Sequence, residues 1–175
     1  MKNQKRSHIR WEKIYEAYNF LNVELFSGHL PFADLRVEPC SGDYAYFQAV
    51  ADNSKDPSTE EEFCEWLAQE SVCDTGPIRK IVLNSELFTN HTDKAILAIL
   101  VHEMLHLWQE IYGKPLRGHH NRQWAGKMKA IGLAPTNLYW PNLETGKFVG
   151  HRIIENGLYA KAFRKLKARG FKLRT

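Results

Sequence analysis

The feature that most constrains this chain is a long apolar stretch that carries two histidines four residues apart. It runs from Ile96 to Trp108 and reads His-Glu-Met-Leu-His between positions 102 and 106. Apolar residues around the whole circumference of a helix predict that the helix is buried. Thr89 or Thr92 can cap its start, and Gly113 is typical of a helix end. We therefore expect a buried helix against which the rest of the chain packs.

The two histidines are spaced to hold one metal ion. On a helix, His102 and His106 leave the same face one turn apart. Glu103 lies one residue further round, where its carboxylate can reach a water on the metal without being a ligand. These are the components of a zinc (Zn2+) hydrolase site. The alternative is a helix with solvated or merely packed histidines. Buried histidines need polar partners, however, and a metal ion supplies them.

A third ligand is expected downstream, because catalytic zinc usually takes three protein ligands. No Asp or Glu occurs between Gly113 and Leu143, so Glu144 is the first available carboxylate. The metzincin spacing is also absent, since Tyr112 stands where its third histidine would be. The segment offers His119 and His120 instead. We expect His119 to be the third metal ligand, with His120 as the alternative. The other interpretation of this pair is an exposed polar loop.

The length of 175 residues predicts one domain, or one domain with a tail. Charge is unevenly spread along it. Positions 52–74 carry eight acidic residues against Lys55, and positions 145–175 carry nine Lys or Arg against Glu155. We therefore divide the chain into a domain over 1–144, with an acidic insertion at about 52–76, and a basic C-terminal extension over 145–175. The extension is a candidate contact for DNA; the alternative is a solvated amphipathic helix.

Compartment is predicted from hydropathy and cysteine content. No apolar run approaches the roughly 20 residues needed to cross a membrane, and no apolar signal-peptide region follows the basic N-terminus. The three cysteines, Cys40, Cys64 and Cys73, are an odd number without C-x-x-C spacing. This pattern favours reduced thiols and excludes a four-cysteine zinc ribbon. We expect a cytoplasmic protein without a membrane partner.

The remaining patterns predict a small sheet beside the histidine helix, and hence an α+β fold. Further helices are expected from about position 7 to 26, from 121 to about 131, and from 156 to 169, with a short one from 58 to about 70. Strands are expected at 35–38, Tyr44–Val50 and Ile78–Asn84, the first two joined through a turn at 41–43. A substrate backbone could pair with an edge strand, for which Tyr44–Val50 and Ile78–Asn84 are the candidates.

Several stretches are familiar in combination: Phe20–Phe26 followed by Gly28–Pro31, then Ile81–Asn84, His102–Gln109 and Gly118–Trp124. Together they resemble the SprT-like family of zinc metallopeptidase domains, which includes the Spartan proteases. The resemblance covers roughly residues 15 to 131. It implies a minimal zincin core and peptide-bond hydrolysis. Carried over residue by residue, it implies that His102, His106 and His119 bind zinc and that Glu103 is the catalytic acid/base.

The chain departs from the family pattern in two places. His120 replaces the glycine after the third-ligand histidine, and positions 145–175 contain no cysteine for the zinc ribbon that many members carry. Spartan-type members act on proteins crosslinked to DNA, so the resemblance implies a protein substrate and DNA as a partner. Two other functions are the alternatives: a zinc hydrolase of a non-protein substrate, and a metal-containing nucleic-acid-binding module without protease activity.

Overall fold

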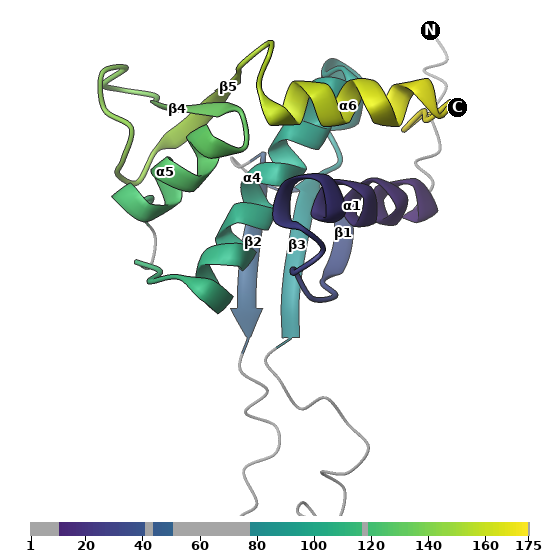
Figure 1. Cartoon of the computed structure of the whole chain (residues 1–175). Coiled ribbons are helices and arrows are strands. Elements are labelled where there is room, and N and C mark those ends of the chain that lie inside the picture. The colour runs from purple at the N-terminus through teal and green to yellow at the C-terminus, as the bar shows by residue number, and fades with distance from the viewer. Residues whose placement is uncertain (1–10, 41–43, 51–77, 117–118, 175) are drawn as a thin grey trace, which may run out of the picture.

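Figure 1 shows a computed structural model of the chain. The structure describes residues 11–40, 44–50, 78–116 and 119–174. The acidic insertion expected at 52–76, its short helix and the turn expected at 41–43 lie outside these residues. None of the helices in the described ranges combines the length and the hydrophobicity that a bilayer-spanning segment needs.

Helices and strands are mixed along the described residues, as expected for an α+β fold. In chain order they are α1 (Trp11–Phe26), β1 (Asp34–Glu38), β2 (Ala45–Val50), β3 (Ile78–Asn84), α3 (Leu87–Asn90), α4 (Asp93–Tyr112), α5 (Arg122–Ala130), β4 (Leu133–Asn137), β5 (Val149–Ile153) and α6 (Leu158–Ala168). The predicted α+β class is confirmed, whereas a zincin-type core stays a prediction.

The strands β1, β3 and β2 form one sheet, in that order. β3 pairs in parallel with β1 and antiparallel with β2. Its central position fits the burial of Ile81, Val82 and Leu83, which are at most 1% exposed. The predicted limits of β3 are confirmed, but the expectation that it could accept a substrate strand is wrong, because both of its edges are already paired. Among the described residues β2 pairs with β3 only.

The end of α1 is fixed by local backbone geometry. Ser27 (φ 57°) and Gly28 (φ 74°) adopt left-handed conformations, and the Gly28 N–H donates to the Asn22 carbonyl at 3.0 Å. This bond and the two left-handed residues end the helix at Phe26. The Asn22 side chain then pairs with both backbone groups of Leu30, at 2.8 and 3.1 Å. The chain is thereby directed from α1 into β1.

α4 is the centre of the hydrophobic core. Its residues Ile96, Leu97, Leu100, Met104 and Leu105 are fully buried, and the helix contacts α1, α5, β2 and β3. The Thr92 side chain accepts a hydrogen bond from Ala95 N, and the helix ends at the Gly113 cap. Because all of its neighbours pack on it, α4 holds its polar residues in a fixed place.

The C-terminal segment packs into the same core. β4 and β5 form a two-stranded antiparallel sheet, and in Figure 1 α6 lies alongside α1. Val149, Tyr159, Leu166, Phe171 and Leu173 belong to the core cluster that α4 and α1 also form. The described residues of this segment, 145–174, are therefore integrated with the domain by packing.

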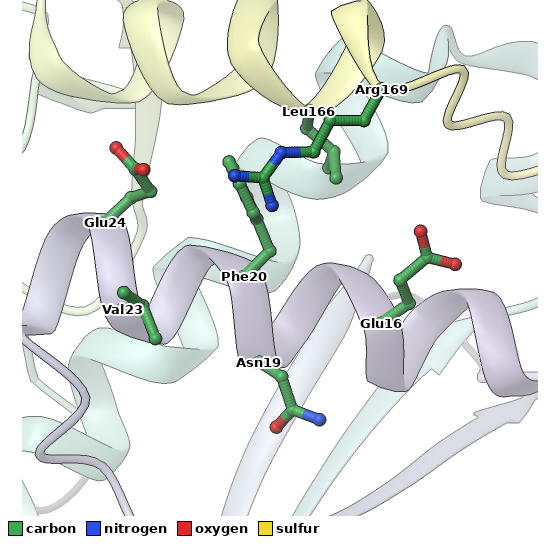
Figure 2. Close-up of a pocket in the computed structure, with 7 residues that line it drawn as sticks. All are labelled: Glu16, Asn19, Phe20, Val23, Glu24, Leu166 and Arg169. Carbon is green, nitrogen blue, oxygen red and sulfur yellow. The ribbon is translucent and has the colours of Figure 1, made fainter.

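A pocket of about 350 Å³ lies between α1 and α6. Figure 2 shows Arg169 reaching over Phe20 at its centre, with Glu16 and Glu24 at its sides. The Arg169 guanidinium is 4.7 Å from the centre of the Phe20 ring, and Lys165 of α6 contacts Glu24 at 2.7 Å. We interpret this pocket as a gap in the α1–α6 packing, because its lining carries no histidine or cysteine.

Candidate metal centre

The two histidines of α4 lie on one face of the helix, as their spacing predicts. The centres of the His102 and His106 rings are 5.2 Å apart. Both side chains are half-buried within a helix whose other residues are largely buried. Since α4 is fixed along its length by the core, these rings start from a rigid base.

The third histidine of the cluster is His120. Its Nε2 atom lies 3.2 Å from Nε2 of His102 and 3.1 Å from Nε2 of His106. Ligand atoms of the three residues all lie within 4.8 Å of one another. His119, which the sequence favours as the third ligand, is exposed and does not belong to this group. The structure therefore brings His120, the alternative candidate, together with His102 and His106.

The position of His120 has a clear structural cause. Its backbone pairs with Gly146 in both directions, at 2.8 and 2.9 Å. Directly after it, Asn121 caps α5 by accepting from the Trp124 N–H at 3.1 Å. His119 instead donates its backbone N–H to the Leu116 carbonyl at 3.0 Å. These bonds set the backbone so that His120, and not His119, faces α4.

The spacing of the three nitrogens suits a metal ion. Zn–N bonds of about 2.0–2.1 Å at tetrahedral angles place ligand nitrogens about 3.3–3.4 Å apart. The observed separations of 3.1 and 3.2 Å are close to this value. Three histidines also leave a fourth position open, as catalytic zinc sites do.

Hydrogen bonding among the histidines does not explain their convergence. His120 Nδ1 lies 3.0 Å from the Gly146 carbonyl oxygen, which only accepts. In neutral His120 the proton is therefore on Nδ1, and Nε2 has a single bare lone pair. That lone pair can accept one good hydrogen bond, yet two other Nε2 atoms lie beside it. A bound cation would use the lone pairs of all three rings at once.

Burial keeps these histidines neutral at physiological pH. It lowers the pKa of His102 well below its usual range, helped by the neighbouring His106, His151 and His120 rings. It lowers the pKa of His106 to about 3, with a further contribution from His120. The pKa of His120 is lowered as well, chiefly by burial. Neutral imidazole is the form that binds metals.

Trp124 packs against all three histidines of the cluster. It is fully buried, and its ring centre lies 4.8, 5.3 and 4.2 Å from those of His102, His106 and His120. The indole therefore covers one side of all three imidazoles. This contact excludes water from that side and limits the rotation of the rings.

Glu103 occupies the place predicted for an acid/base. It follows His102 directly on α4 and is only 5% exposed. A carboxylate this deeply buried next to a histidine cluster is unusual unless it serves a metal site or a hydrogen-bond network. The arrangement provides a carboxylate directly next to a candidate metal ligand, His102.

The sequence analysis missed three supporting residues. Gln109 of α4 donates to Asn121 Oδ1 at 2.7 Å and to Gln123 Oε1 at 3.2 Å, which links α4 to the start of α5. Gly146 holds His120 as described above. His151 of β5 lies with its Nδ1 atom 3.2 Å from Nδ1 of His102. The His-x-x-x-His spacing gives no hint of these, because Gln109 acts through contacts with α5, and Gly146 and His151 come from a distant part of the chain.

Comparison with known proteins gives one match. A sequence model of the SprT-like family matches residues 15–144. No curated protein and no solved structure matches the chain. Because the matched residues make up well over half of the chain and include the three clustered histidines and Glu103, the chain belongs to the SprT-like family.

Proposed function

We propose that this member of the SprT-like family is a zinc-dependent peptidase. The observation that carries the proposal is that Nε2 of His120 lies 3.1–3.2 Å from the Nε2 atoms of both His102 and His106, beside a buried glutamate. His102, His106 and His120 would hold the metal. A ligand set made only of imidazoles, with His120 at the spacing from His102 and from His106 that tetrahedral ligands have, fits zinc among the common protein metals.

In the proposed mechanism, metal binding, proton transfer and the positioning of the rings are carried out by different residues. A zinc ion held by the three histidines would supply Lewis acidity toward a peptide carbonyl and a bound water. Glu103 accepts a proton from the attacking water and then donates it to the leaving amine. Gly146 and Trp124 hold the rings in place during these transfers.

The sheet offers a place for the substrate backbone. The edge of β2 that faces away from β3 has no strand partner within the described ranges, and β2 contacts α4. An extended peptide can add to such an edge through main-chain hydrogen bonds. We propose that substrates bind along Ala45–Val50, which would bring them close to the histidine-bearing helix.

We also propose that the substrates are DNA-associated proteins and that the protein acts in the cytoplasm. The resemblance to Spartan-type members and the basic residues of positions 145–175 support DNA-associated substrates. The odd number of cysteines supports the cytoplasm. Some of this positive charge is used inside the protein. Lys165 pairs with Glu24 at 2.7 Å and Lys167 with Asp93 at 3.7 Å. The exposed Arg152, Lys161 and Lys172 are better placed for a partner.

The test is release of peptides from an unfolded casein substrate, with and without DNA. The proposal predicts hydrolysis that a chelator abolishes and added zinc restores. Absence of hydrolysis by zinc-loaded protein under both conditions would contradict it. Salt-sensitive DNA binding without hydrolysis would instead favour the nucleic-acid-binding module.

A further inference from the structure

A fourth histidine reaches the metal centre from a separate part of the chain. His151 lies in β5, where it is opposite Pro135 of β4. Alternate residues of a strand point to the same face, so His151 shares a face with Val149, which is 6% exposed, and with Ile153, which packs against the core. Arg152, between them, is exposed. The alternation of β5 thus directs His151 toward α4.

His151 contacts His102 on the edge of the ring that faces away from the cluster. The two Nδ1 atoms are 3.2 Å apart, whereas it is Nε2 of His102 that faces His120. One nitrogen of His102 is therefore used for the cluster and the other for His151. This arrangement places His151 outside the group of three candidate ligands.

We propose that His151 is a positioning residue that accepts a hydrogen bond from His102 Nδ1 and thereby keeps His102 Nε2 free to bind the metal. The proposal rests on the metal site proposed above. A neutral imidazole has one N–H and one bare nitrogen. Placing the proton of His102 on Nδ1 leaves the lone pair on Nε2, where the metal would bind. His151 then carries its own proton on Nε2.

His120 has a corresponding hydrogen bond at its own Nδ1 atom. The Gly146 carbonyl, 3.0 Å from His120 Nδ1, fixes the proton on the nitrogen that faces away from the cluster. Two of the three candidate ligands are thus contacted at Nδ1, the nitrogen that faces away from the cluster, by residues of one short segment, 146–151. This segment lies beyond residues 15–144, which the family model matches. The metal centre of this chain therefore depends on its C-terminal part.

Such supporting hydrogen bonds have a measurable effect. A partner on the second ring nitrogen fixes the orientation of a ligand histidine and raises its basicity, and its loss typically weakens metal binding 10- to 100-fold. His151→Leu removes the acceptor. His151→Asn has nearly the same shape as the leucine variant but places an acceptor oxygen close to the position of the original Nδ1 atom. The two variants therefore form a matched pair.

The experiment measures zinc affinity by competition with a chromophoric chelator for wild type, His151→Leu and His151→Asn. We expect about 10- to 100-fold weaker binding for the leucine variant and binding within a few-fold of wild type for the asparagine variant. Circular dichroism shows whether each variant is folded. Equal zinc affinity of folded His151→Leu and wild type would overturn the proposal, as would equally weak binding by both folded variants.

A second measurement needs no variant. Long-range ¹H–¹⁵N NMR of the metal-free wild type reports which ring nitrogen of His102 carries the proton. We expect it on Nδ1; a proton on Nε2 would overturn the proposal. These measurements are distinguishable from a test of the peptidase proposal. If the zinc affinities and the tautomer are as expected but no peptide is released, the role of His151 is supported and peptidase activity is contradicted. A wild type that binds no zinc would contradict both.

Discussion

Glu103 is the side chain at which metal binding and catalysis can be separated. It follows the candidate metal ligand His102 and is 5% exposed, but in the proposed mechanism it transfers protons and is not a ligand. Glu103→Gln keeps the shape of the side chain and removes the basic oxygen. We predict a loss of peptidase activity of about 10²- to 10⁴-fold with zinc content unchanged.

The measurements are the rate of peptide release and the zinc content of the same preparation. Loss of both activity and zinc would show that Glu103 supports the metal site itself. A variant that retained wild-type activity would exclude Glu103 as the acid/base.

Single residues also show what the sequence could and could not predict. The spacing of His102 and His106 predicts their shared face, because helix geometry alone determines it. The choice between His119 and His120 depends on a loop, where adjacent side chains diverge. The pairing with Gly146, 26 residues away, helps to direct His120 inward, and local sequence does not reveal it. A possible sequence signal was the cap at Asn121, because the residue just before a helix start is close to its first turn.

Among the elements, the junction between α4 and α5 positions the third histidine. Asn121 accepts from Trp124 N at 3.1 Å and from Gln109 Nε2 at 2.7 Å, and it donates to the Lys114 carbonyl at 2.7 Å. We predict that Asn121→Ala lowers the free energy of unfolding by about 1–2 kcal/mol. Asn121→Asp keeps the accepting oxygen and loses only the donor to Lys114, so it should lose less. Denaturant unfolding compares the two; equal stability of Asn121→Ala and wild type would contradict the importance of this cap.

The packing of α6 on α1 gives a second test at this scale. Leu166 is 1% exposed, whereas Leu158 in the same helix is 51% exposed. We predict that Leu166→Ala lowers the free energy of unfolding by about 2–5 kcal/mol and that Leu158→Ala changes it by less than about 0.5 kcal/mol. Chemical denaturation measures both. Similar small effects in the two variants would show that α6 is not part of the core.

The elements differ in how well local patterns predict them. β3 and α4 have clear signals, since a β-branched run and a capped apolar run define their limits. The β4–β5 sheet was missed. Pro135 within Leu133–Asn137 is typical of a loop, and a proline is tolerated in a strand only where its missing N–H is not needed. The order β1-β3-β2 could not be predicted either, because it depends on pairing across the long segment between β2 and β3.

At the scale of the whole molecule, Tyr159 joins the C-terminal segment to the histidine helix. It is fully buried and donates its hydroxyl hydrogen to the Lys94 carbonyl. Burial raises the pKa of its phenol above the usual value of 10. The unfolded chain therefore loses this proton first, so the stability associated with Tyr159 is complete below about pH 10 and falls as pH rises further.

We predict that Tyr159→Phe is less stable than wild type at neutral pH by about 1 kcal/mol. Above pH 10 the difference should narrow by up to about 1.4 kcal/mol per pH unit, since only the wild type has this phenol to ionise on unfolding. Denaturant unfolding at pH 8, 10 and 11 measures the difference. A constant difference across this range would contradict the buried, neutral state of Tyr159.

The most direct test of the metal centre is the zinc content per chain of wild type, His119→Ala and His120→Ala, measured by elemental analysis after zinc loading and removal of free metal. The structure predicts one zinc ion in wild type and in His119→Ala, and loss or strong weakening of zinc binding in His120→Ala, because His120, in contrast to His119, has its Nε2 beside those of His102 and His106. Retention of zinc by His120→Ala together with its loss from His119→Ala would contradict this site, and so would a wild type that binds no metal.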